Sequence, residues 1–279
     1  MVVVDMPKIS KSDIYKCCCN GIKDEAKKNK LLNYLYVFLL NACDYRNSVR
    51  EKFLDKYIIK EPINYKKFAR YEDIKNDLFD LYDKRLVRGK EPRKYYNQIK
   101  ASPKLGKCPY CGLGHVSTLD HYLPKSEFPI FSILPNNLIG CCRDCNTTKR
   151  NTVLNTIHPY YDDFTKTQWL FAKVNWSELT MDFFVDTKNI NNDLDRKKIE
   201  GHFSVYELAK RYAVEAASEL NDLGIEFGNK NLTKTDIKEE LNEKFKSKAM
   251  NHINHWKTAM YQALSKDQCY CSGGYNKFL

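Results

Sequence analysis

The sequence lacks several features that would place it in common functional classes. It has no run of 18 apolar residues, so we expect no membrane-spanning helix. The apolar stretch at residues 2–4 is too short for a signal peptide, so we expect no export by that route. There is no internal repeat, no long linker and no Walker-type phosphate loop. Any control by ATP is therefore expected to come from another protein.

Cysteine is present in a number that argues against a disulfide framework. The chain has 11 cysteines, an odd count, and they are unevenly spread. Together with the missing export signal, this favours a reducing compartment, and we expect a cytoplasmic protein. Cys17, Cys18 and Cys19 are consecutive, which is awkward for one metal ion, so we expect them to pack as small apolar groups or to include a free thiol.

Length and pattern predict an α+β protein that is mostly α-helical. A chain of 279 residues exceeds a typical single domain. We divide it into a basic helical region at 1–107, a central module at 108–158, and a strand pair with further helices at 159–279. Residues 29–41 are apolar almost throughout, which predicts one buried helix. Trp169 to Asn175 and Met181 to Val185 are typical of a strand pair.

The basic charge is concentrated in the first region. The formal net charge is +11, and residues 1–107 alone carry that excess. Basic residues interleaved with tyrosines are typical of a face that follows a nucleic-acid backbone. The candidates are Lys66, Lys67, Arg70, Lys84, Arg85, Arg88, Lys90, Arg93 and Lys94, with Tyr65, Tyr71, Tyr95 and Tyr96 among them. A solvated lysine-rich surface without a site is the alternative.

Two C-x-x-C pairs enclose the central module. Cys108 and Cys111 form one pair, and Cys142 and Cys145 form the other. Four thiolates from two such turns suit the tetrahedral geometry that Zn²⁺ prefers, so we predict a structural zinc site. Buried thiols without a metal, or a redox dithiol, are the alternatives. Cys141 could compete with Cys142, although only Cys142 has the two-residue gap to Cys145.

Between the pairs the sequence predicts a strand, a loop, a return strand and a helix. Asp120 and His121 end the first strand, where adjacent side chains point to opposite faces and should do different work. The return strand is expected at residues 137–140. The helix is expected at residues 143–151, with Asp144 as a possible N-cap and with Lys149 and Arg150 on its surface.

This stretch resembles the HNH endonuclease family, which has a ββα-metal fold. The matching residues are Asp120 and His121, Asn137 sixteen residues after His121, Asn146 nine residues further, and Lys149. Many members of the family carry zinc-binding cysteine pairs at these flanks. One departure is that the last family position is often His, whereas this chain has Asn146. An amide oxygen there suits Mg²⁺ or Mn²⁺ better than Zn²⁺.

The resemblance implies a role for each matched residue. His121 would be the general base that takes a proton from water. Asp120 and Asn146 would hold one divalent ion at the scissile phosphate. Asn137 would fix the hairpin and orient His121, and Lys149 and Arg150 would contact nucleic acid, DNA more than RNA. A surface carboxylate beside a structural histidine is the alternative for Asp120 and His121.

The C-terminal region looks, more loosely, like the PtuB-type HNH effector subunits of bacterial anti-phage systems of the Septu and retron kinds. That likeness implies a nuclease controlled by a separate ATPase partner. The acidic C-terminal helices would then face the partner, or simply complete the fold. His158 could approach the metal or a phosphate, although a structural role beside Pro159 is the simpler reading. A zinc-stapled nucleic-acid-binding or scaffold module that no longer cuts is the competing function.

Overall fold

A computed structural model describes residues 4–52, 54, 71–150 and 156–279. They form two compact units: an N-terminal unit of Val3–Leu154 with His158–Asp162, and a C-terminal unit of Asn155–Ile157 with Asp163–Leu279. The regions predicted at 1–107 and 108–158 thus both belong, almost entirely, to the N-terminal unit. Within the described ranges, no helix combines the length and the apolar character needed to cross a membrane.

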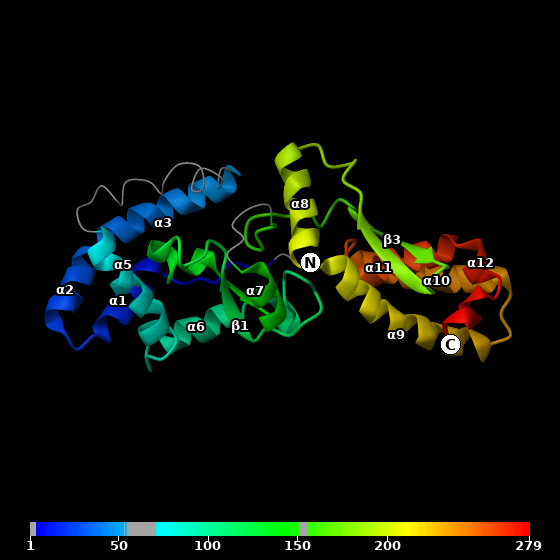
Figure 1. Cartoon of the computed structure of the whole chain (residues 1–279), viewed down its shortest axis with the longest axis horizontal. Helices are drawn as coiled ribbons and strands as arrows, with labels where there is room; N and C mark the ends of the chain where they lie inside the picture. Colours follow the sequence, from blue (N-terminus) through cyan, green and yellow to red (C-terminus); the bar gives the residue numbers. More distant parts are fainter. Residues whose placement is uncertain (1–3, 53, 55–70, 151–155) are drawn as a thin grey trace. The chain divides into compact units, whose positions relative to one another are not determined.

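The elements are mainly helices, as the sequence predicted, with two small antiparallel sheets (Figure 1). The elements of the N-terminal unit are α1 (Lys11–Asn20), α2 (Glu25–Asn33), α3 (Leu35–Arg50), α5 (Tyr71–Asp80), the π-helix η1 (Leu81–Leu86), α6 (Arg93–Lys100), the short turns η2 (Lys104–Gly106), η3 (Pro129–Phe131) and η4 (Pro135–Asn137), β1 (Thr118–His121), β2 (Leu138–Cys141) and α7 (Arg143–Lys149). The elements of the C-terminal unit are β3 (Leu170–Asn175), β4 (Thr180–Val185), α8 (Asp193–Val205), α9 (Leu208–Gly228), α10 (Lys234–Asn251), α11 (Trp256–Lys266), α12 (Gln268–Cys271) and η5 (Gly274–Phe278). The predicted α+β, mostly α class is confirmed.

Helices α1, α2 and α3 pack together at the start of the N-terminal unit. The single buried helix predicted at residues 29–41 is wrong, because α2 ends at Asn33 and α3 begins at Leu35. Within this stretch Tyr36 and Leu40 are exposed, whereas Leu31, Val37 and Phe38 are buried. Tyr15 of α1 fixes the break, since its buried hydroxyl donates to the carbonyl of Leu31, 2.9 Å away.

The hairpin predicted in the central module is confirmed. Strand β1 pairs antiparallel with β2, with Asp120 opposite Ile139 and His121 opposite Leu138. Helix α7 follows directly. Its N-cap is Cys142, whose sulfur accepts from the amide of Cys145, so the proposal of Asp144 as the cap is wrong. The cap lies earlier because the second cysteine pair itself turns the chain into the helix.

The C-terminal unit is built on the second hairpin. Strands β3 and β4 pair with Leu170 opposite Val185, as the alternating pattern predicted. Helices α9 and α11 pack against this sheet, and α10 packs on α11. One face of the sheet is therefore buried, with Phe183 against the ring of Tyr212. Helices α8 and α9 are separated at Glu207, whose φ of 50° interrupts the helical path.

Candidate active site and zinc centre

The four cysteines of the two C-x-x-C pairs meet at one point. The sulfurs of Cys108, Cys111, Cys142 and Cys145 all lie within 4.8 Å of one another, and all four residues are buried. The sulfurs of Cys111 and Cys142 are 3.9 Å apart. A disulfide needs about 2.05 Å, and none of the 11 cysteines forms one. A tetrahedral zinc ion with bonds of about 2.3 Å would place its sulfurs roughly 3.8 Å apart. The cluster could therefore hold a structural zinc ion.

The turns around the sulfurs explain the glycines near them. Gly112 has a φ of +71°, which the tight turn of the first pair requires and which glycine adopts without strain. A Cβ at Gly114 would lie 2.7 Å from the Cβ of Cys142, so only glycine lets the two turns approach. The amides of Leu113 and Gly114 donate to the sulfur of Cys111. Hydrogen bonds from the other three cysteines lower the pKa of Cys111 and favour its thiolate, and the bond from Cys108 has the largest effect.

Cys141 does not compete for this site. It lies in β2, opposite Thr118, and is outside the four-sulfur cluster. Burial raises the pKa of its thiol, so Cys141 packs as a neutral side chain.

Asp120 is buried and bonded on both oxygens. The hydroxyl of Tyr110 donates to Oδ2 at 2.8 Å, and the ammonium of Lys149 lies 3.2 Å from Oδ1 and 3.0 Å from Oδ2. Burial raises the pKa of Asp120, while Lys149 and Tyr110 stabilise its charged form. The placement of Lys149 on the surface of α7 is wrong. Its side chain is fully buried because it neutralises Asp120 and donates to the carbonyl of His121 at 2.7 Å.

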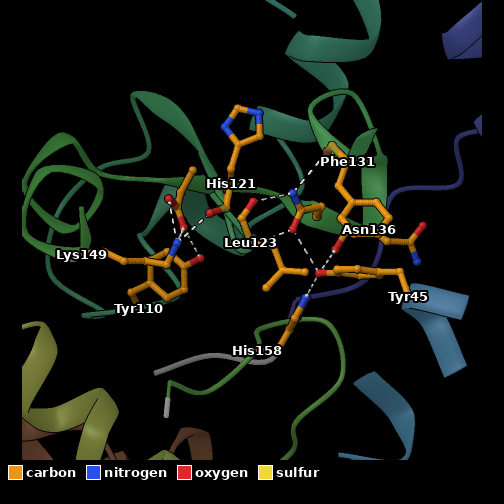
Figure 2. A network of polar contacts seen from close by, with 10 residues as sticks. Tyr45, Tyr110, His121, Leu123, Phe131, Asn136, Lys149 and His158 are labelled. Carbon is orange, nitrogen blue, oxygen red and sulfur yellow. Dashed lines mark hydrogen bonds and ion pairs between the residues drawn. The ribbon is translucent and has the colours of Figure 1, made fainter. Parts of the chain in front are cut away.

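His121 points away from Lys149 and Tyr110, which are the partners of its strand neighbour Asp120 (Figure 2). Adjacent side chains of a strand are expected to point to opposite faces. Its Nε2 lies 2.9 Å from the carbonyl oxygen of Ser132, and a carbonyl can only accept. Nε2 therefore carries the proton, and the lone pair of the neutral ring lies on Nδ1. Nδ1 has no hydrogen-bond partner in the described part of the chain. Burial lowers the pKa of His121 to about 3, so the ring is neutral at pH 7.

Asn137 fixes the loop that carries this carbonyl. Its Nδ2 donates to the carbonyls of Leu123 and Phe131, and its Oδ1 accepts from the amide of Leu123 at 2.7 Å. Phe131 precedes Ser132, so Asn137 positions the segment whose carbonyl orients His121. Asn137 is fully buried, and it acts on His121 indirectly, through the backbone groups of Leu123 and Phe131.

His158 and Tyr45 extend the same network (Figure 2). The amide of Tyr160 donates to Nδ1 of His158, so Nε2 of the neutral ring donates to the hydroxyl of Tyr45, 3.1 Å away. That hydroxyl lies 3.2 Å from Oδ1 of Asn137 and can donate to it. His158 is buried and does not line the cavity described below. Its role is structural, and the idea that it approaches a metal or a phosphate finds no support.

One cavity of about 400 Å³ is lined by the candidate catalytic and metal-binding residues Asp120, His121 and Asn146. Its walls are formed by Phe79, Tyr82, Thr118, Leu119, Asp120, His121, Pro124, Lys125, Ser126, Asn146 and Arg150. Asp120 and His121 come from β1, and Asn146 comes from α7. The carboxylate and the amide offer the oxygen ligands that Mg²⁺ or Mn²⁺ prefers.

The other basic candidates have mixed surroundings. Lys84 pairs with Asp80, Arg85 donates to the carbonyl of Gly21, and Arg88 is exposed. Arg93 and Lys94 lie over the rings of Tyr96 and Tyr95, so these cations and rings face each other. Tyr65, Lys66, Lys67 and Arg70 lie outside the described residues, as does the side chain of Tyr71. Among the basic candidates that the structure describes, Arg150 is the one that lines the cavity.

Tyr110, Ser132 and Lys125 are among the residues that shape this site without being indicated by the sequence pattern. Tyr110 binds Asp120, Ser132 orients His121, and Lys125 lines the cavity. Only Tyr110 had a local signal, since it lies between the first two cysteines. Ser132 acts through its backbone, which no side-chain pattern reveals.

The fold and the site define a mostly helical α+β protein with a four-cysteine centre beside a cavity that presents a carboxylate, an imidazole and an amide. The chain is similar to protein ea31 of Escherichia phage lambda, with 26% identity over 296 residues, covering 98% of this chain and 100% of that protein. The likeness thus spans both units. No family model and no solved structure matches the chain.

Proposed function

We propose that this protein is a metal-dependent endonuclease of the HNH type that hydrolyses phosphodiester bonds, in DNA first and RNA second. The observation that carries the proposal is that Asp120, His121 and Asn146 line one cavity. The second support is the hydrogen bond from His121 to Ser132, which leaves Nδ1 as the free acceptor.

In this proposal each residue has one task. Nδ1 of His121 accepts a proton from a water whose oxygen attacks phosphorus, and the bond from phosphorus to the 3′ oxygen breaks. A divalent ion held by Asp120 and Asn146 would offset the charge that develops on the phosphate and on the leaving oxygen. Lys149 and Tyr110 favour the charged form of Asp120 against the effect of burial and fix its position. Asn137 holds the loop that orients His121.

The test is a cleavage assay of the full chain with supercoiled plasmid, single-stranded DNA and tRNA, in Mg²⁺ or Mn²⁺. Wild type is compared with His121→Ala and with His115→Ala, an exposed histidine of the same module. We expect wild type and His115→Ala to cut and His121→Ala to lose at least 100-fold in rate, as removal of a general base typically does. Equal cutting by His121→Ala would disprove the role of His121.

We further propose that the protein is an anti-phage effector under the control of an ATPase partner. The support for this role is the resemblance of the C-terminal region. If the chain alone cuts nothing, the product of the neighbouring gene is added with ATP. Cleavage that appears only then supports a partner-controlled nuclease. Binding without cleavage under both conditions supports the zinc-stapled binding or scaffold module.

A further inference from the structure

The wall of the cavity beside His121 is aromatic and comes from outside the hairpin. Phe79 of α5 and Tyr82 of η1 both line the cavity. They are three residues apart, which places them on neighbouring positions of a helical surface. The rings of Tyr82 and His121 meet edge to face, with centroids 4.4 Å apart. The aromatic wall therefore adjoins the group that would accept the proton of the attacking water.

A cation accompanies this wall. The ammonium of Lys125 lies 6.0 Å from the ring centre of Phe79 and 4.9 Å from that of Tyr82. Asp83 holds it in place with oxygens at 2.6 and 2.7 Å. Lys125 and Arg150 both line the cavity, so positive charge stands beside an aromatic face. This combination is complementary to a nucleotide, whose base stacks while its phosphate meets the cations.

Of the two rings, Phe79 is the one available to a ligand. Tyr82 is only 8% exposed, whereas Phe79 is partly exposed. The cavity of about 400 Å³ lies in the range of roughly 300–1,000 Å³ that holds small ligands, which is room for one nucleotide.

We propose that Phe79 forms a stacking subsite for one unpaired base beside the bond to be cut, so that the substrate is single-stranded or locally unpaired nucleic acid. In a duplex, neighbouring base pairs cover both faces of every base, so a base can reach Phe79 only after leaving the stack. The position of the cut bond rests on the proposed function. The binding of the base does not.

The experiment measures binding with no divalent ion added, so that cleavage plays no part. Labelled single strands, duplexes and duplexes with one bulged base, each as DNA and as RNA, are titrated by fluorescence anisotropy. The variants are Phe79→Leu, which keeps the apolar volume, Phe79→Trp, which restores an aromatic face, and Phe184→Leu as the control. Phe184 is 40% exposed and stacks on Phe171 in the other unit.

We expect Phe79→Leu to weaken binding of the single-stranded and bulged ligands by about five- to 100-fold. Duplex binding should stay unchanged, and Phe79→Trp should restore wild-type affinity. Wild type, but not Phe79→Leu, should also quench a 2-aminopurine base placed in the single strand. Comparison of the DNA ligands with the RNA ligands shows which of the two nucleic acids binds more tightly.

Two results would overturn the subsite: equal affinity of Phe79→Leu and wild type for single strands, or a wild-type preference for perfect duplex. Neither depends on whether the chain cuts. Conversely, if stacking is observed and no substrate is cleaved with metal and partner present, the subsite stands and the nuclease proposal fails.

Discussion

The ammonium of Lys149 lies 3.0 Å from Oδ2 of Asp120, and the two side chains are 0% and 5% exposed. The ammonium of Lys84 lies at the same 3.0 Å from Oδ2 of Asp80, but those side chains are 60% and 27% exposed. The two pairs share this distance and differ in burial, and Asp80 also has a second cation, Lys27, 3.0 Å from its Oδ2.

Lys149→Met should lower the free energy of unfolding by about 3–5 kcal/mol, because it leaves a buried carboxylate without its cation. Lys84→Met should cost about 0–1 kcal/mol, because the pair is exposed and Lys27 still contacts Asp80 at 3.0 Å. Urea unfolding followed by circular dichroism measures both changes. Similar losses in the two variants would show that the Lys149 pair is not desolvated.

Cys142→Ser should lose the zinc ion and destabilise the N-terminal unit, because a structural zinc contributes directly to folding. Cys141→Ser should keep the ion, since Cys141 is equally buried but lies outside the four-sulfur cluster. Elemental analysis of the purified chains should give about one zinc in wild type and Cys141→Ser. Zinc retained at full occupancy by Cys142→Ser would rule out the tetrad.

Tyr45→Phe should shift the ring of His121, because the hydroxyl of Tyr45 is part of the network that holds Asn137. Tyr15→Phe is the matched control: it also removes a buried hydroxyl, one bonded to Leu31 and not connected to Asn137. Both should lose about 0.5–1.5 kcal/mol of stability.

Nitrogen chemical shifts of the histidine rings distinguish the two tyrosine variants. At pH 7, wild type should show His121 neutral with its proton on Nε2. Only Tyr45→Phe should perturb these signals. Unchanged His121 signals in Tyr45→Phe would mean that the network ends at Asn137.

Glu219 should make the C-terminal unit sensitive to acid. Burial opposes its charge, but Lys257 and Tyr261 donate hydrogen bonds and lower its pKa overall. The unfolded chain then binds the proton more readily, so the stabilisation is present above the unfolded pKa of about 4.3 and is lost as the pH falls through the lower folded pKa.

Glu219→Gln should therefore cost about 1–3 kcal/mol at pH 7 and progressively less below pH 4. All three tryptophans, at positions 169, 176 and 256, belong to this unit, so tryptophan fluorescence reports its unfolding. A difference between variant and wild type that stays constant from pH 7 to pH 3 would contradict the linkage.

Local spacing was sufficient for the parts of the site that are close in sequence. Two C-x-x-C pairs predict one cluster because each turn already brings two sulfurs together. The alternation around Asp120 and His121 predicts a strand whose neighbours point apart. The structure has the cysteine cluster, and it has the strand, in which Asp120 contacts Tyr110 and Lys149 whereas His121 contacts Ser132.

Contacts between residues that are far apart in the sequence could not be predicted. A lysine near the end of a polar helix is expected on the surface, and Lys149 is buried only because Asp120, 29 residues earlier, faces it. Tyr45 and His158 are separated by 113 residues, and no local pattern indicates that they bond. The prediction of a single helix at 29–41 was wrong for a related reason, because tertiary packing places a break at Tyr34 within that range.

The ties of the hairpin to α3, α5 and α6 have a consequence for protein engineering. Ser132 donates to the carbonyl of Leu78 in α5, Tyr45 of α3 reaches Asn137, and a Cβ at Gly140 would lie 2.9 Å from the carbonyl of Lys100. A fragment cut at the borders of the cysteine pairs would keep the zinc ligands and lose these supports. Such a fragment would keep the sequence motif but would not hold Asp120, His121 and Asn146 in their positions. A version of this site that is transferred to another protein must therefore include the helices from α3 to α6.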